Sequence, residues 1–216
     1  SPFAREWQAA APNRLTRAIE KARLKGRPPL DLVTANPHDH GLEFPVERLA
    51  EITFRALRER PTVRRYAPHP LGQPEAREAV AAWYHRRGYP AARPERVCLT
   101  PGTSLAYFYA LRLLAEPGAE VLVPRPSYPL FDDLCAAADV RPRAYHLAGR
   151  PEGWRLDLED LAFQITPRTR AVIAVSPHNP TGMIPSAEDW SALGAICRRH
   201  RLPLILDEVF CEFLEP

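Results

Sequence analysis

Two segments in the middle of the sequence carry residue types that suit a flat, phosphorylated ligand. Gly102 is followed by Thr103 and Ser104 at the expected start of a helix. Free backbone N–H groups and the helix dipole at such a start favour a phosphate, although a plain N-cap accounts for the same residues. Tyr128 lies in a proline-rich turn, where its ring can cover a planar ligand or simply pack against the turn.

Two further segments supply an amide and a carboxylate. Asn179 begins the sequence Asn-Pro-Thr-Gly, which is typical of a tight turn and can also present an amide to a ligand oxygen. Asp207 ends an apolar segment, where a carboxylate is costly unless a salt bridge or a helix N-terminus stabilises it. The functional alternative is a charge that holds a protonated ring nitrogen. Each segment alone leaves structure and ligand binding open.

The elements that must position these residues alternate between strand-like and helix-like patterns. Short, mostly apolar runs are typical of strands buried on both faces of a parallel sheet. They occupy residues 97–100, 121–123, 171–175 and 203–206. Between them, residue spacing and caps predict helices that start at Pro74 and at Ser186, and a helix buried nearly all round over 103–115. The alternation indicates a layered α/β fold.

Each chemically interesting segment directly follows one of the expected strands. In open α/β sheets, ligands bind in the crevice beyond the carboxyl ends of the strands. A phosphate cradle, an aromatic cover, an amide and an acid are therefore expected at one edge of one sheet. A pyridine ring that carries a phosphate, a phenolic oxygen and a basic nitrogen would engage all four.

At these residues the sequence resembles the class I/II aminotransferases, fold-type I enzymes that depend on pyridoxal 5'-phosphate (PLP). The similarity is carried by Tyr-Ala-Pro at 66–68, Leu-Thr-Pro-Gly-Thr-Ser at 99–104, Pro-Ser-Tyr-Pro at 126–129, Ser-Pro-His-Asn-Pro-Thr-Gly at 176–182 and Asp-Glu-Val-Phe at 207–210. The resemblance implies a three-layer αβα large domain of the PLP-dependent transferase type, with a mostly parallel sheet that is incomplete here.

The resemblance also implies roles for the matching residues. Gly102, Thr103 and Ser104 would bind the phosphate of PLP. Tyr128 would stack on the pyridine ring, and Asn179 would donate a hydrogen bond to its phenolic oxygen.

Other implied roles concern the ring nitrogen, the neighbouring subunit and the substrate. Asp207 would pair with the pyridinium nitrogen, and Phe210 stands where the family usually has a Tyr, so that one donor to the phenolic oxygen is missing. Tyr66 resembles the tyrosine that reaches the phosphate of the partner subunit, which implies a homodimer. The loop from Asn36 to Gly41 resembles the segment near the substrate carboxylate.

The Schiff-base lysine of the family has no counterpart in the sequence. Lys21 and Lys25 are the only lysines, and neither matches a catalytic position. That lysine is expected beyond Pro216, so the chain is interpreted as an inactive N-terminal fragment without a catalytic residue. The complete protein is expected to transfer an amino group between an amino acid and a 2-oxo acid.

The first part of the sequence differs from the rest. Residues 1–45 are interpreted as an arm or part of a small domain, and 46–216 as the truncated PLP-binding large domain. Within the arm, a helix is expected over about 5–25, a short strand at 31–34 and a loop over 36–45.

Several alternatives remain open at this stage. The cofactor-binding motifs also fit a C–S lyase, a decarboxylase or an enzyme like aminocyclopropane-carboxylate synthase, because reaction choice is set mostly by other residues. A non-catalytic PLP-binding regulator would also keep the pocket.

Charge, apolar runs and cysteine spacing indicate which classes of partner and which cellular compartment to expect. A formal net charge of +3 over 216 residues argues against a nucleic-acid binder, and no apolar run of about 20 residues predicts a membrane span. Four cysteines without CxxC spacing and the lack of an export signal indicate a reduced, cytoplasmic protein. The sequence His-Asp-His at 38–40 favours a solvated loop over a metal site, and no metal is expected.

Overall fold

The computed structural model describes residues 14–30 and 36–213, and the chain divides into two compact units. These units are Ser1–Leu99 and Thr100–Pro216. The strand expected at 31–34 lies outside the described residues. The domain boundary expected at residue 45 stays a prediction.

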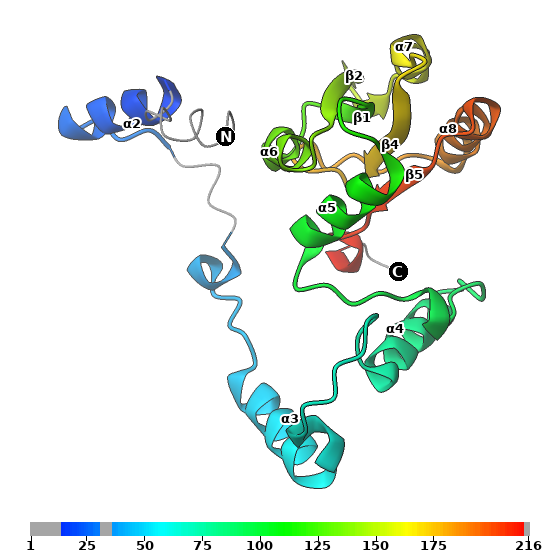
Figure 1. Ribbon diagram of the computed structural model, residues 1–216. Helices are drawn as coiled ribbons and strands as arrows, with labels where there is room; N and C mark the ends of the chain where they lie inside the picture. The colour runs from blue at the N-terminus through cyan, green and yellow to red at the C-terminus, as the bar shows by residue number, and fades with distance from the viewer. Residues whose placement is uncertain (1–13, 31–35, 214–216) are drawn as a thin grey trace. The chain divides into compact units, whose positions relative to one another are not determined.

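The first unit is helical in its described part. Its α-helices are α2 (Arg14–Leu24), α3 (Val46–Glu59) and α4 (Pro74–Arg86), and its short 3₁₀ helices are η1 (Pro37–His40), η2 (Pro61–Arg64) and η3 (Pro94–Arg96) (Figure 1). Helix α2 falls within the expected helix over 5–25, and α4 begins at Pro74 as predicted. Helix α3 was not predicted, and the expected loop over 36–45 contains η1.

One expected strand is absent from this unit. Residues 97–100 follow η3 without forming a strand, although Val97 has an extended backbone. Leu99 donates one backbone hydrogen bond to the carbonyl of Leu71. An apolar, β-prone sequence forms a strand only when a ladder partner lies beside it, and the described residues provide none here.

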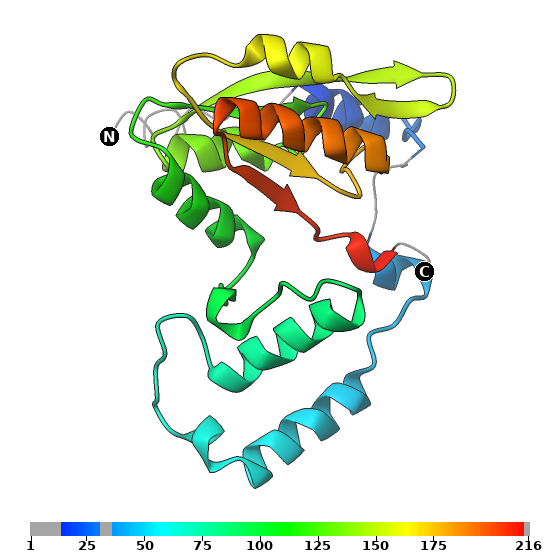
Figure 2. The ribbon, with the colours of Figure 1, turned by 90° about the vertical axis from the view of Figure 1, so that its right-hand side faces the viewer.

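The second unit is built on a five-stranded sheet with the order β3-β2-β1-β4-β5. The strands are β1 (Glu120–Arg125), β2 (Arg141–Arg150), β3 (Gly153–Leu156), β4 (Thr169–Val175) and β5 (Leu204–Asp207). Strand β1 pairs in parallel with β2 and β4, β4 pairs in parallel with β5, and only β2 and β3 are antiparallel. Figure 2 shows the β2–β3 hairpin and β5 at opposite margins of this sheet. The expected α/β class with a mostly parallel sheet is therefore confirmed.

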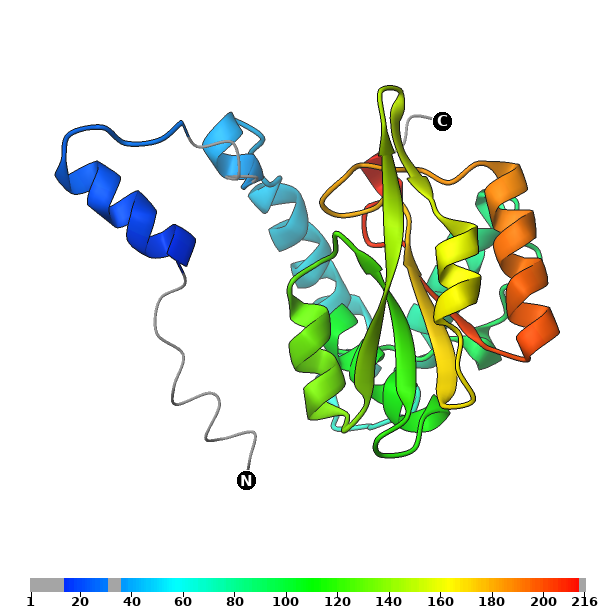
Figure 3. The same cartoon turned by 90° about the horizontal axis from the view of Figure 1, so that it is seen from above.

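Helices cover both faces of the sheet, so the unit has three layers (Figure 3). Along β1, Val121 and Val123 point to one face and Leu122 to the other, as the two-residue period of a strand requires. The first face packs against α5 (Thr103–Leu114) and α6 (Leu130–Ala137), and the second against α7 (Leu158–Gln164) and α8 (Ala187–His200). All the central side chains of β1 and β4 are buried, which explains their continuous apolar sequences.

The capping box predicted at the start of one helix is present, but the burial predicted for another helix is only partly observed. Helix α8 begins with the expected capping box, in which Ser186 and Asp189 each accept a hydrogen bond from the other's backbone N–H. Helix α5 was expected to be buried nearly all round. It buries Tyr107 and Leu111, whereas Leu113 on another face is 84% exposed. Only the face toward the sheet is covered among the described residues.

Candidate functional site

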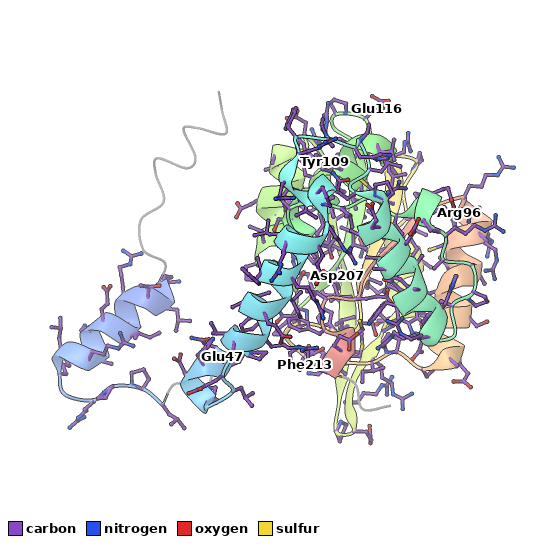
Figure 4. All side chains as sticks on the ribbon, turned by 90° about the horizontal axis from the view of Figure 1, so that it is seen from below. Glu47, Arg96, Tyr109, Glu116, Asp207 and Phe213 are labelled. Atoms are coloured by element: carbon purple, nitrogen blue, oxygen red, sulfur yellow. The ribbon has the colours of Figure 1, made fainter. Side chains whose placement is uncertain are left out.

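A cavity of about 150 Å³ lies at the carboxyl edge of the sheet in the second unit. Its walls come from the start of α5, the segment after β1, helix α6, the end of β4 with its following loop, and the end of β5. The lining residues are Thr103, Ser104, Tyr107, Tyr128, Phe131, Leu134, Val175, Asn179, Asp207, Val209 and Phe210. In Figure 4, Asp207 lies between Phe213 on one side and Tyr109 and Glu116 on the other.

Sheet register places two of the four predicted segments side by side. Val175 at the end of β4 is directly opposite Asp207 at the end of β5, and the Ser176 N–H donates to the Asp207 carbonyl at 2.9 Å. The loop that contains Asn179 therefore starts beside the carboxylate. The predicted residues that share this one cavity are Thr103, Ser104, Tyr128, Asn179, Asp207 and Phe210.

The start of α5 forms one end of the cavity. Gly102 is the N-cap residue, and no side chain caps the helix, so the first backbone N–H groups lack a capping acceptor. Thr103 and Ser104 are exposed, and within the described residues neither hydroxyl has a hydrogen-bond partner. This end of the cavity can accept an anion without breaking an existing bond.

The Asp207 carboxylate is held by two donors. The Val209 N–H donates to Oδ1 at 2.8 Å, and the hydroxyl of Tyr107 donates to Oδ2 at 2.6 Å. Burial raises the pKa of the Tyr107 hydroxyl above its usual range, and the hydrogen bond to Asp207 and the charge of that carboxylate raise it further. Tyr107 is therefore a neutral donor.

Sequence reasoning missed Tyr107. One signal was available, because Tyr107 lies four residues after Thr103 and such pairs share a helix face. A polar group on the sheet-facing side of α5 must find a partner when it is buried.

Aromatic rings form the wall between the helix start and the acid. Phe131 is fully buried and packs edge-to-face with Tyr107, with ring centroids 5.2 Å apart, and with Tyr128 at 6.2 Å. Tyr128 is 43% exposed and lines the cavity, so it is accessible to a ligand. Arg125 and Asp132, paired at 2.6 Å, connect the two ends of the turn that carries Tyr128.

Backbone hydrogen bonds hold the loop around Asn179. The His178 N–H donates to the Met183 carbonyl at 2.9 Å, and the Gly182 N–H donates to the His178 carbonyl at 2.7 Å. Gly182 has a φ of +70°, a left-handed conformation that glycine adopts at little cost. Within the described residues the Asn179 amide has no hydrogen-bond partner, so both its donor and its acceptor are available to a ligand.

Three of the predicted site residues belong to the first unit. Asn36 caps η1 by accepting from the His38 N–H at 3.3 Å, and Gly41 ends that helix in a left-handed conformation. Tyr66 is 96% exposed. The ligand roles expected for these three residues stay predictions.

Neither a metal site nor a membrane span is found in the part of the chain that the structure describes. No group of three or more His, Cys, Asp or Glu side chains there is arranged to hold a metal ion. No described helix has the length and apolar character that crossing a membrane requires.

Comparison with known proteins decides the family. Residues 29–216 match the family model described as aminotransferase class I and II. The chain belongs to the class I and II aminotransferase family. The resemblance inferred from the motifs is thereby confirmed.

Individual relatives of this aminotransferase-family chain agree. The chain is 31% identical over 190 residues to the glutamate-pyruvate aminotransferase AlaA of Escherichia coli K12, which covers 88% of this chain and 45% of that protein. It is 32% identical over 211 residues to the aspartate/prephenate aminotransferase of Thermus thermophilus, covering 96% of this chain and 53% of that protein. The solved alanine aminotransferase of Pyrococcus furiosus superposes with a TM-score of 0.76 at 27% identity, over 93% of this chain and 52% of that one. The chain thus spans about half the length of the relatives it matches.

Proposed function

We propose that the protein containing this chain is a PLP-dependent aminotransferase that transfers an amino group between an amino acid and a 2-oxo acid. The observation that carries the proposal is the single cavity shared by an uncapped helix start, an exposed aromatic ring, a free amide and a carboxylate. The family match and the relatives named for amino-group transfer support it. They favour transamination over the lyase, decarboxylase and regulator alternatives.

The residues present fit the cofactor. A cavity of about 150 Å³ is similar in volume to cavities that hold a benzene-sized ring. The open helix start and the hydroxyls of Thr103 and Ser104 suit a phosphate, and the free amide of Asn179 suits the phenolic oxygen. Each oxygen of Asp207 accepts one hydrogen bond and keeps a further acceptor position, which suits a protonated ring nitrogen.

Bound PLP would supply an electron sink for the bond changes at the amino-acid Cα. The chain's own residues bind and orient it. Tyr128 would cover one side of the ring, and Phe210 would add an apolar wall. The negative charge of Asp207 would favour the protonated form of the ring nitrogen.

The resemblance to the family also suggests roles for residues of the first unit, a domain division and a cellular location. We propose that Tyr66 contributes to the phosphate site of a partner subunit in a homodimer, and that Asn36 and Gly41 lie near the substrate carboxylate. We also propose that residues 1–45 belong to a small domain, that 46–216 belong to the cofactor-binding domain, and that the protein works in the cytoplasm.

Binding of pyridoxamine 5'-phosphate to the full-length polypeptide that carries this chain tests the proposal. We expect saturable binding, measured by calorimetry, that weakens at least tenfold when Thr103 and Ser104 are changed to Val and Ala, since hydrogen bonds to a charged group are lost. Ser186→Ala is the matched control, because it removes a hydroxyl from another helix start. Equal binding by the wild type and the double variant would count against the site.

A further inference from the structure

The side chain of Tyr107 links two parts of the cavity that lie far apart in the sequence. Its hydroxyl, on α5, reaches Asp207 at the end of β5, with 2.6 Å between the oxygens. The side chain is 5% exposed and is packed edge-to-face against Phe131. Because the ring is held on its flank, the hydroxyl has little freedom to turn away from the carboxylate.

The second donor to Asp207 completes its orientation. Val209 donates its backbone N–H to Oδ1, whereas Tyr107 donates to Oδ2. A carboxylate with one donor on each oxygen cannot rotate about its Cβ–Cγ bond without breaking a bond. Among the described residues no Lys, Arg or His forms an ion pair with Asp207, so both donors are neutral.

Helix α5 carries both this donor and the open helix start. Thr103 and Tyr107 are four residues apart, which places them on one helix face about 6 Å apart along the axis. One rigid element therefore carries both Thr103, at the helix start that suits a phosphate, and Tyr107, which contacts the Asp207 carboxylate.

We propose that Tyr107 is a positioning residue that holds the Asp207 carboxylate toward the ring nitrogen of bound cofactor and keeps it ionised. The proposal rests on the proposed function, since it needs a ligand with a basic ring nitrogen in this cavity. Tyr107 acts through Asp207 and needs no contact with the ligand. A hydroxyl that donates to a carboxylate stabilises the charged form, so the proton shared between the acid and the ring stays on the ring.

The chemistry of Tyr107 suits this task. Burial and the neighbouring carboxylate raise the pKa of the Tyr107 hydroxyl, so it remains a donor throughout the range in which aminotransfer is assayed. A charged donor such as Arg would neutralise Asp207 and compete with the ring nitrogen for it. A phenol orients the carboxylate without neutralising it, so the negative charge of Asp207 can still interact with the ring nitrogen of the ligand.

Tyr107→Phe tests the proposal, because it keeps the ring against Phe131 and removes only the hydroxyl. Two probes are compared by calorimetry in the full-length protein: pyridoxamine 5'-phosphate, and its carbocyclic analogue in which a CH group replaces the ring nitrogen. We expect the Kd for pyridoxamine 5'-phosphate to rise about tenfold and the Kd for the analogue to stay within twofold, since a bond to a charged group contributes at about this level. Equal losses for both probes, or no loss for either, would overturn the proposal.

Matched variants separate positioning from general damage. Tyr109→Phe makes the same change on the same helix outside the cavity, and Tyr145→Phe removes another buried phenol, which donates to the Ile173 carbonyl at 2.9 Å. Both should retain the wild-type preference for the nitrogen-containing probe. In an Asp207→Asn background, Tyr107→Phe should add less than a twofold change; a full additional tenfold loss would contradict the proposal.

The same measurements distinguish this inference from the proposed function. A wild-type protein that binds neither probe, or binds both equally with no effect of Asp207→Asn, would overturn the proposed function and this inference with it. A wild-type preference for the nitrogen-containing probe that depends on Asp207 but survives Tyr107→Phe would overturn the role of Tyr107 alone.

Discussion

Glu120 and Asp207 are carboxylates at opposite ends of the same sheet, and their surroundings differ in charge. Glu120, which begins β1, is 5% exposed and accepts hydrogen bonds from the guanidinium of Arg168 and the hydroxyl of Thr166. Asp207 ends β5, and among the described residues its carboxylate accepts only from a phenol and a backbone amide. The sheet therefore carries one carboxylate that is already paired with a cation and one that is not.

The difference separates a structural role from a binding role. The bonds from Thr166 and Arg168 lower the pKa of the Glu120 carboxyl, so its charge is stabilised within the fold. The half-buried carboxylate of Asp207 is oriented by neutral donors, so its negative charge can still pair with a positively charged group of a ligand. The unpaired acid lies in the cavity and the paired one does not.

Asp207→Asn is expected to have the largest effect of the changes that test this contrast. In the full-length protein we expect aminotransferase turnover to fall by about 10²- to 10³-fold, the range seen when a charge-stabilising group is removed from an active site. The unfolding free energy should change by less than about 1 kcal/mol, because no cation loses its partner. Turnover assays and urea unfolding check both effects, with exposed Asp133→Asn as the control; normal turnover would refute the binding role.

Glu120→Gln should show the reverse pattern. Loss of the charge leaves Arg168 unpaired, and we expect the unfolding free energy to fall by about 1–2 kcal/mol. The Arg168 side chain is 63% exposed, so water recovers part of the interaction. The Kd for pyridoxamine 5'-phosphate should stay within twofold. If Glu120→Gln weakened cofactor binding without lowering the unfolding free energy, the structural role assigned to Glu120 would be wrong.

The stabilisation by Glu120 should depend on pH. Its pKa is lowered in the folded state, so its contribution is present above the usual carboxyl range near about 4.3 and is lost as pH falls through the folded-state value. The difference in unfolding free energy between wild type and Glu120→Gln should therefore be constant at about pH 6–7 and shrink below about pH 4. Urea unfolding at several pH values measures it, and a difference that grows in acid would have the wrong sign.

Phe210→Tyr should give the smallest effect. It adds one hydroxyl to a wall of the cavity, near enough to the family's usual arrangement that folding should be unaffected. We expect the pH at which the absorbance of the cofactor-loaded, full-length protein changes to shift by less than about one unit, since one hydrogen bond of about 1 kcal/mol is gained. An unchanged spectral titration would show that position 210 does not reach the chromophore.

The sequence predicted those strands whose residue pattern has a single physical explanation. The strands near 121–123 and 171–175 were predicted because a short, continuous apolar run between turns is typical of a strand buried on both faces. Strand β2 was missed because its sequence, Arg141–Arg150, is rich in Arg and only Tyr145 and Leu147 are buried. Its place in the sheet is set by its parallel pairing with β1, which no local pattern reveals.

The same limit applied to the site. The segments after β1, β4 and β5 were found because parallel strands place their carboxyl ends at one edge. Tyr107 was missed because its partner is a hundred positions away, and long-range side-chain pairing has no local sequence pattern. The segment 97–100 was overpredicted for the related reason that strand propensity does not supply a neighbouring strand.

The position of β5 at the margin of the sheet has a consequence for how the acid is held. Within the described residues β5 pairs on one side only, with β4, and Leu206 just before Asp207 is 41% exposed. The outer backbone N–H and C=O groups of so short a strand can accept another strand. Any segment that paired with this edge would cover Leu206 and restrain the backbone that carries the Asp207 carboxylate. Pairing at the edge of the sheet and ordering of the cavity for its ligand would therefore occur together.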